Sequence, residues 1–247
     1  MKAVLYIRSV LYWLGFIIVT VIVGALVIIA YPLPSDWRLL IARQWGVLSL
    51  WWLKISCGLS YVVEGREHIG EQNAIVMCKH QSTWETIALH AIIPSGRWVF
   101  KRELLMIPVF GWALACTDPI AIDRSAGRKA VRQLVEKGTA KLKRGKWIII
   151  FPEGTRTSPG AETKYKMGGA VLAAESGYPV LPIAHNAGEF WPKHSFIKYP
   201  GRITVRIGEY IDSRDRDAAT ILQQTRDWIE TQMQEISDPS RWNRQSG

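Results

Sequence analysis

The chain begins with a long apolar segment and continues with short apolar runs separated by polar stretches. Residues 11–30 are almost continuously apolar, and no charged residue lies between Arg8 and Asp36. About 20 apolar residues are enough to cross the hydrocarbon core of a bilayer. A secretory signal peptide would have a shorter apolar region and a small-residue cleavage site, and residues 31–34 do not provide one. We therefore expect a membrane anchor that is retained.

The charges around this segment indicate that the chain returns to the side on which it started. The basic residues on its flanks are Lys2, Arg8, Arg38 and Arg43. Positive flanks favour the cytoplasmic side, so a second apolar stretch, residues 45–63, is needed to return the chain. It carries Lys54 at its middle, which makes lying in the interface as compatible with the sequence as spanning. We predict a two-helix membrane anchor over residues 1–63 and a globular domain over residues 64–247.

The globular part alternates short apolar runs with helical patterns. The runs predict strands at residues 74–78, 97–100, 119–122, 147–151, 180–184 and 203–207. Helices are expected after Ser82, from residue 101 to a break at 107–111, at 128–143 and at 215–236. This alternation predicts an α/β fold with a single, mainly parallel or mixed sheet flanked by helices.

Charge and cysteine content narrow the class of protein. The formal net charge is +10, which favours an anionic partner such as a phosphorylated substrate or an acidic membrane surface. No nucleic-acid-binding motif is present, so we expect no nucleic acid partner. The three cysteines form no CxxC pair, which indicates a reducing compartment. The histidines have no metal-like spacing, and we expect no metal and no cofactor.

His80 and Glu85 are the candidate chemical groups. They follow the strand predicted at residues 74–78, and the carboxyl edge of an open α/β sheet is where such folds bind ligands. With His80 in the turn and Glu85 in the first helical turn, a carboxylate can hold the imidazole as a general base. Ser82 and Glu85 also fit a capping box. The local sequence leaves both interpretations open.

Three further motifs favour the catalytic interpretation. They are Ile122-Asp123-Arg124-Ser125, Phe151-Pro152-Glu153-Gly154-Thr155-Arg156-Thr157 and Val180-Leu181-Pro182-Ile183-Ala184. Together with the His80–Glu85 segment, they resemble the four ordered motifs of the glycerolipid acyltransferases, over residues 74–187. The family more often has aspartate where this chain has Glu85.

The resemblance assigns roles to the remaining polar residues. Arg124, directly after a predicted strand, and Arg156 are candidate phosphate clamps, since a guanidinium can bind phosphate bidentately. Lys101 is similar to a second basic contact of the family. Glu153 is expected to orient an arginine or an acceptor hydroxyl, and Gly154 and Thr155 complete the predicted substrate-binding loop.

The resemblance implies a membrane-bound acyltransferase that uses acyl-CoA or acyl carrier protein. The expected acceptor is the sn-2 hydroxyl of 1-acylglycerol 3-phosphate (lysophosphatidic acid), and the expected product is phosphatidic acid for phospholipid synthesis. We expect the enzyme at the inner membrane, with its catalytic domain facing the cytoplasm and an anionic membrane as partner. Two alternatives remain open: another lyso-lipid acceptor, such as lyso-ornithine lipid or lysophosphatidylglycerol, and a non-catalytic lipid-binding protein.

Overall fold

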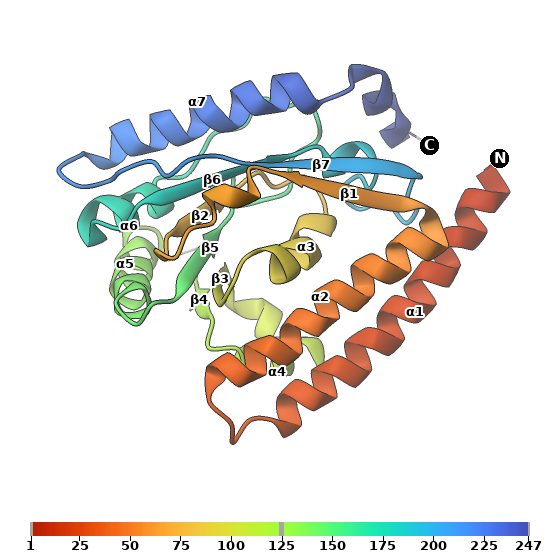
Figure 1. Ribbon diagram of the computed structural model, residues 1–247, viewed down its shortest axis with the longest axis horizontal. Helices are drawn as coiled ribbons and strands as arrows, with labels where there is room; N and C mark the ends of the chain where they lie inside the picture. Colours follow the sequence, from red (N-terminus) through yellow and green to blue (C-terminus); the bar gives the residue numbers. More distant parts are fainter. Residues whose placement is uncertain (1, 124–125, 247) are drawn as a thin grey trace.

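A computed structural model describes residues 2–123 and 126–246, and the side chains of 243–246 are not discussed. Two long helices, α1 (Lys2–Ile29) and α2 (Ser35–Cys57), form an antiparallel hairpin beside an α/β domain (Figure 1). The strands are β1 (Leu59–Glu64), β2 (Ile75–Cys78), β3 (Gly96–Lys101), β4 (Ile120–Ile122), β5 (Trp147–Ile150), β6 (Val180–His185) and β7 (Gly201–Ile207). The remaining helices are α3 (Trp84–Ile92), α4 (Phe110–Ala115), α5 (Arg128–Leu142), α6 (Gly168–Ser176) and α7 (Ala218–Ile236). Short 3₁₀ segments are η1 (Arg66–His68), η2 (Arg102–Met106), η4 (Ala187–Glu189) and η5 (Pro239–Ser246).

The strands form one mixed sheet in the order β1-β7-β6-β2-β5-β3-β4. All neighbouring pairs are parallel except β6 and β7. The carboxyl ends of β2, β3, β4, β5 and β6 therefore lie at one edge. This confirms the predicted single sheet, and it brings the segments that follow β2, β3, β4 and β5 to the same side of the domain.

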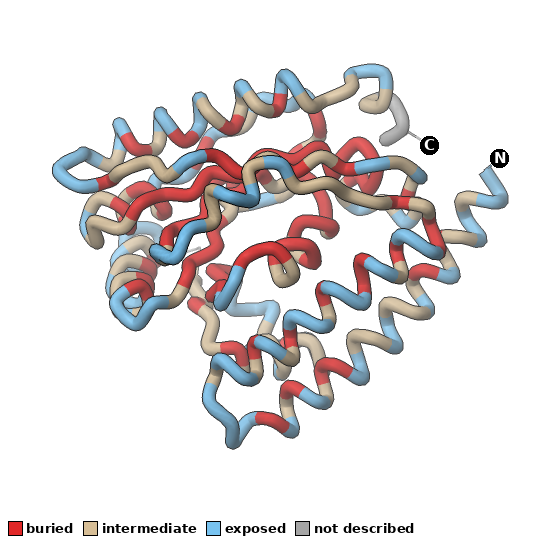
Figure 2. Tube along the Cα trace, in the orientation of Figure 1, coloured by how far each residue is buried: buried red, intermediate tan, exposed pale blue. Residues whose placement is uncertain are grey.

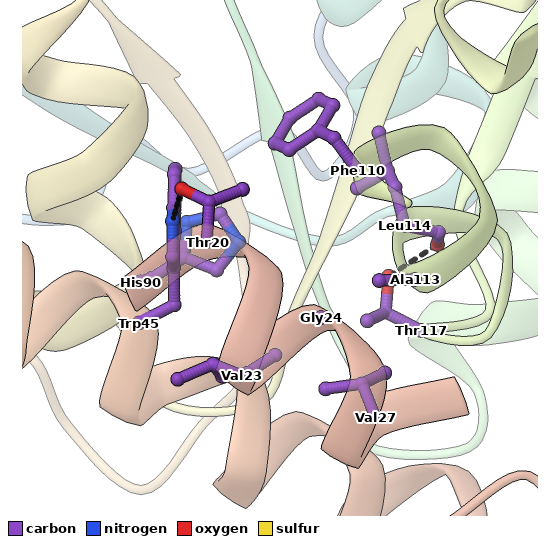
Figure 3. Close-up of a pocket in the computed structure, with 11 residues that line it drawn as sticks. Thr20, Val23, Gly24, Val27, Trp45, His90, Phe110, Ala113, Leu114 and Thr117 are labelled. Atoms are coloured by element: carbon purple, nitrogen blue, oxygen red, sulfur yellow. Dashed lines mark hydrogen bonds between the residues drawn. The ribbon is translucent and has the colours of Figure 1, made fainter. Parts of the chain in front are cut away.

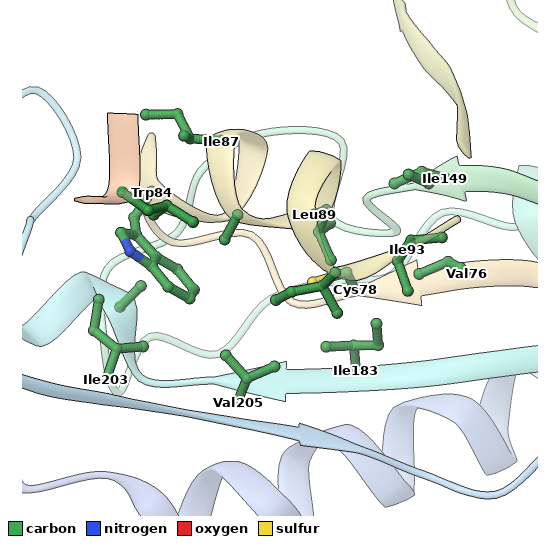
Figure 4. Packing of buried hydrophobic residues seen from close by; sticks show 14 of the residues in the cluster. Val76, Cys78, Trp84, Ile87, Leu89, Ile93, Ile149, Ile183, Ile203 and Val205 are labelled. Carbon is green, nitrogen blue, oxygen red and sulfur yellow. The ribbon is translucent and has the colours of Figure 1, made fainter. Parts of the chain in front are cut away.

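Side chains along each strand alternate between the two faces of the sheet, and a layer of helices packs on each face. Val76 and Cys78 point toward α3 and belong to the cluster drawn in Figure 4. Ile75 and Met77 point to the other face, where α5 and α6 pack. The helix α7 also lies on that second face, away from α3 and the hairpin (Figure 1). The central strands are buried on both faces, as expected for parallel strands covered by helices.

The hairpin packs closely on the α3 side of the domain. A Cβ atom at Gly46 of α2 would lie 2.8 Å from the carbonyl oxygen of Ile87 in α3, so only glycine allows this approach. The Trp45 indole N–H donates to Thr20 Oγ1 at 2.9 Å and joins α2 to α1. The outward turns of both helices are exposed along their length (Figure 2). Among the described residues, only α1 has the length and composition to cross a membrane.

The expected boundary between anchor and domain, at residue 63, falls within a strand. Residues 59–64 form β1, which pairs in parallel with β7 at the edge of the sheet. The helix α2 ends at Cys57 because Gly58 adopts a left-handed conformation (φ 66°) and caps it. The apolar stretch 45–63 is therefore part helix and part strand.

Candidate active site

His80 and Glu85 are in contact, with His80 in the turn after β2 and Glu85 in the first turn of α3. His80 Nδ1 lies 2.8 Å from Glu85 Oε1. Since a carboxylate only accepts hydrogen bonds, Nδ1 carries the hydrogen and Nε2 is the basic nitrogen. Among the described residues, Nε2 has no hydrogen-bond partner. The pair thus presents a free basic nitrogen at the carboxyl edge of the sheet.

The same carboxylate also closes the turn between β2 and α3. Glu85 Oε1 accepts from the backbone N–H groups of Gln81 and Ser82, both at 2.8 Å. Ser82 Oγ accepts from the Trp84 N–H at 3.1 Å and donates to the Trp191 carbonyl at 2.6 Å. One carboxylate thus contacts the imidazole and also makes half of the predicted capping box, since Glu85 accepts from the Ser82 N–H while Ser82 Oγ accepts from Trp84 and not from Glu85. Ser82 is fully buried and engaged, so its hydroxyl is not presented as a nucleophile.

Phe151 fixes the plane of the His80 ring. The two rings stack with centroids 3.9 Å apart and an interplanar angle of 9°. Only 14% of the His80 side chain is exposed. With Glu85 holding one nitrogen and Phe151 covering one ring face, the imidazole has little freedom to rotate.

Glu85 is held in its ionised form inside the protein. Burial alone would raise its pKa, but the neighbouring His185 and His80 imidazoles and the Ser82 N–H outweigh burial and lower the pKa. The second oxygen, Oε2, lies 3.8 Å from His185 Nε2 and has no hydrogen-bond partner among the described residues. His185 thus acts on the carboxylate from the Oε2 side, while His80 and the Ser82 N–H act on Oε1.

His185 is a supporting residue that the sequence interpretation did not single out. Burial lowers the pKa of His185, while the Glu85 carboxylate acts in the opposite direction. Nε2–H donates to the Lys79 carbonyl at 2.8 Å, and Nδ1 accepts from the Ala187 N–H at 3.2 Å. The ring therefore fixes the backbone directly before His80. Its position at the carboxyl end of β6, next to β2, is the signal that would have found it.

Glu153 supports the backbone of His80 and contacts a lysine, and its expected role toward an arginine or an acceptor hydroxyl stays a prediction. Its Oε1 accepts from the His80 N–H at 3.1 Å and lies 3.6 Å from Lys79 Nζ. Lys79 Nζ also donates to Glu230 Oε1 at 2.7 Å, which accepts from the Tyr165 hydroxyl at 2.9 Å. Burial raises the pKa of Glu153 to about 7, although the Lys79 charge acts in the opposite direction. Together with the partly exposed Glu230, the buried side chains of Lys79 and Glu153 form a scaffold behind the dyad.

The predicted phosphate-binding residues lie around the same edge. Arg156 Nη1 donates to Thr83 Oγ1 at 2.8 Å, three residues after His80. Lys101, at the end of β3, is about half exposed and pairs with Glu103 at 3.0 Å. Thr155 is exposed, and Gly154 has a left-handed φ of 69° that favours glycine. Arg124 lies outside the described residues.

Two cavities flank the catalytic layer. One, of about 50 Å³, lies between the hairpin, α3 and α4 and is lined by Thr20, Trp45 and His90 (Figure 3). It has room for a few waters. The other, of about 410 Å³, lies between α5 and α6 and reaches Phe151. Ligand cavities are typically about 300–1,000 Å³, so the second of these two is ligand-sized. Within the described residues, no group of three His, Cys, Asp or Glu side chains could hold a metal.

The geometry is that of general-base chemistry. A buried carboxylate orients an imidazole whose free nitrogen can take a proton from a hydroxyl. The surrounding basic residues, Lys101 and Arg156, suit a substrate that carries an anionic group. No nucleophilic side chain is presented beside the imidazole in the described part of the chain, which favours direct transfer to the hydroxyl.

Comparison with known proteins gives one consistent family. Residues 60–186 match the Acyltransferase family. The chain is 42% identical to the 1-acyl-sn-glycerol-3-phosphate acyltransferase of Pseudomonas aeruginosa, over 96% of this chain and 94% of that protein. It is 27% identical to the enzyme of the same name from Cocos nucifera, over 82% and 66% of the two chains.

The fold is also similar to a solved structure. The crystal structure of the 1-acyl-sn-glycerophosphate acyltransferase of Thermotoga maritima superposes with a TM-score of 0.77, over 93% of this chain and 94% of that chain, at 25% identity. The predicted resemblance is thus confirmed along nearly the whole chain. The protein is an enzyme of the acyltransferase family.

Proposed function

We propose that the protein transfers a fatty acyl group from a thioester donor to the free sn-2 hydroxyl of lysophosphatidic acid, forming phosphatidic acid. The hydrogen-bonded His80–Glu85 pair, with Nε2 unpaired beside basic residues, is the observation that supports this most directly. The names of the relatives from Pseudomonas aeruginosa and Thermotoga maritima support the acceptor.

In the proposed mechanism, His80 Nε2 takes the proton of the acceptor hydroxyl as its oxygen attacks the thioester carbon. Glu85 stabilises the imidazolium that forms. The carbon–sulfur bond then breaks, and the proton passes from His80 to the leaving sulfur. General-base catalysis of this kind contributes about 10²–10⁴-fold to the rate.

Arg156, Lys101 and Arg124 are proposed to bind the acceptor phosphate. Arg156 is held by Thr83 in the turn that carries His80, so a phosphate on this guanidinium would sit close to the general base. Lys101 reaches the same edge from β3. Gly154 and Thr155 form the loop beside them, and Glu153 supports the turn from behind.

We further propose that the hairpin lies in the interfacial plane of the cytoplasmic leaflet of the inner membrane. The outward faces of α1 and α2 carry apolar side chains, which include Leu14, Ile18, Leu40, Leu48 and Trp51. The N-terminal half of α1 also contacts the 191–198 loop, where Ser9 Oγ accepts from the Lys198 N–H at 3.0 Å. The α1 residue Val23 packs with Ala113 of α4 in the same cluster. Because α1 contacts the domain near both of its ends, it is more easily placed along the membrane surface than across the bilayer.

A panel assay tests the acceptor. The purified full-length protein is given acyl-CoA or acylated acyl carrier protein as donor. Lysophosphatidic acid, lysophosphatidylglycerol or lyso-ornithine lipid is the acceptor, and the lipid products are separated. We expect turnover of lysophosphatidic acid at the highest kcat/KM. Turnover of another lyso-lipid without that of lysophosphatidic acid would replace this proposal.

The variant His80→Ala separates an enzyme from a lipid-binding protein. We expect transfer to be abolished while flotation with anionic vesicles stays unchanged, because His80 is not part of the exposed apolar faces of the hairpin that are proposed to contact the membrane. Undiminished transfer in this variant would contradict the general-base assignment.

A further inference from the structure

The exposed face of α5 carries a concentration of basic side chains. Arg128, Lys129, Arg132 and Lys137 are all exposed, and Glu136 is the single acidic residue of this helix. None of the ion pairs described for residues 2–123 and 126–242 involves these four. Two other basic residues of this region are paired: Lys141 with Asp118, and Lys146 with Asp36 at 2.7 Å.

Holding these charges together costs free energy in the isolated protein. Arg128 and Arg132 are one turn apart, and like charges at this spacing repel each other. The opposite face of the helix, formed by residues such as Leu134 and Leu142, is buried against the sheet. The basic face therefore cannot turn inward, and an anionic partner would relieve the repulsion.

The ligand-sized cavity opens at the amino-terminal end of this helix. Its apolar walls include Val99, Leu134 and Ile150, and it reaches Phe151, whose ring stacks on His80. Arg128 and Lys166 also line it. The cavity thus leads from the basic face of α5 toward the general base, and its mostly apolar lining suits an uncharged flexible chain.

The basic face does not share a surface with the apolar hairpin. The helix α5 packs on the face of the sheet that carries α6 and α7, whereas α2 packs on the α3 face (Figure 1). A membrane that receives the hairpin would leave α5 toward water. This geometry favours a soluble partner over anionic lipid.

We propose that Arg128, Lys129, Arg132 and Lys137 dock an acidic carrier protein, which bears the acyl group as a thioester on a flexible arm. The arm enters the cavity between α5 and α6. This inference rests on the proposed function and names its acyl donor. The ester C–O bond forms as the C–S bond breaks, and the acceptor proton passes through His80 to the carrier thiol.

The length of the charged face along α5 favours a donor carried on a protein over one carried on a nucleotide such as acyl-CoA. The four residues span nine positions, or about 14 Å along the helix axis at 1.5 Å per residue. A nucleotide would concentrate its phosphates at the mouth of the cavity, near Arg128. Charges that continue to Lys137 match an extended acidic surface.

The test compares two charge-reversal variants of the full-length protein. The docking variant is K129E/R132E/K137E. The matched control, R66E/R202E/R226E, makes the same change in net charge at exposed arginines outside α5 that no described ion pair involves. The KM for acylated acyl carrier protein and for acyl-CoA is measured with lysophosphatidic acid at saturation. We expect the docking variant to raise the KM for the carrier at least tenfold and for acyl-CoA less than threefold, while the control changes neither by more than threefold.

Each other outcome overturns the inference. An equal rise in KM for both donors would show that the face binds polyanions in general. Weaker flotation of the docking variant with anionic vesicles, at unchanged KM, would show that the face binds the membrane. Unchanged values throughout would leave the face without a docking role. Binding of holo-carrier protein, measured by fluorescence anisotropy, tests the docking face independently of the acceptor. If charge reversal weakens this binding but the wild type transfers no acyl group to lysophosphatidic acid, the proposed acceptor is wrong and the docking proposal stands.

Discussion

Replacing Glu85 by glutamine removes the charge behind His80 and leaves the turn intact. The Glu85 carboxylate accepts three hydrogen bonds through Oε1: from His80 and from the N–H groups of Gln81 and Ser82. The amide oxygen of glutamine can accept all three. Alanine would instead leave two buried N–H groups unpaired, and the folding cost of each, about 1–3 kcal/mol, would obscure the catalytic effect.

The expected loss follows from the geometry. With charge centres about 4 Å apart and an effective dielectric constant of about 20, the imidazolium–carboxylate attraction is about 4 kcal/mol. It is present only after His80 has taken the proton, so it acts on the transition state. At about 1.4 kcal/mol per decade, Glu85→Gln should lower kcat about 10³-fold with little change in either KM.

A continuous assay of thiol release from acyl-CoA with lysophosphatidic acid measures kcat and both KM values. Glu175→Gln, at an exposed position on α6, is the matched control and should retain wild-type kcat. Thermal unfolding of both variants should remain within about 5 °C of the wild type. If folded Glu85→Gln kept a kcat within fivefold of the wild type, the carboxylate would not stabilise a charged His80, and the dyad reasoning would fail.

Four further variants test the scaffold and the phosphate clamp. The pKa of Glu153 in the folded protein is raised to about 7. Its contribution to stability is therefore complete below about pH 4.5 and is lost as the pH rises to about 7, by about 3 kcal/mol. The variant Glu153→Gln should flatten this dependence of Tm on pH, and parallel curves for variant and wild type would contradict it. Arg156→Lys keeps the charge but loses the bidentate fork, so the KM for lysophosphatidic acid should rise about tenfold or more with kcat nearly unchanged; an unaltered KM would count against the clamp. Gly46→Val should destabilise the hairpin contact with α3 by about 1–3 kcal/mol, and an unchanged Tm would show that the contact is not required. His185→Phe should lower kcat about tenfold to a hundredfold without raising KM, because the His80 backbone loses its support, whereas a purely structural role would lower Tm alone.

The central strands could be predicted from the sequence because they are buried on both faces. Runs such as residues 74–78 and 147–151 contain few polar residues and are bounded by polar turns, and the structure confirms them as β2 and β5. The contact between His80 and Glu85 is only one of two interpretations of the local sequence, and the resemblance of the four ordered motifs to a known family favours it.

The strand β1 and the helices α4 and α6 could not be read in this way. The helix α4 begins at Phe110, inside the predicted break at residues 107–111. The strand β1 continues the apolar run of α2, so hydrophobicity alone does not separate them; the one local signal is Gly58 at the end of the helix. The helix α6 is built largely of small residues, from Gly168 to Ala174, and shows no apolar period. Its position depends on packing between α5 and α7.

The scaffold behind the dyad depends on contacts that are distant in sequence. Lys79 meets Glu230 across 151 positions, and His185 meets the Lys79 carbonyl across 106. No local spacing contains these pairs. Only the rule that ligands and functional groups gather at the carboxyl ends of parallel strands points to His185, and nothing comparable points to Glu230 on α7.

The position of His80 at the edge of the sheet bears on how one site can serve two very different substrates. A side chain in the middle of a strand faces one side of a sheet, whereas His80, in the turn after β2, contacts α3-side residues through Glu85 and the α5-side cavity through Phe151. On the proposals above, the lipid acceptor comes from the hairpin side and the soluble donor from the α5 side. Neither has to pass the other, because the imidazole lies where the two approaches meet. Variants of the α5 face should therefore change donor kinetics, and variants of the hairpin face should change access to lipid.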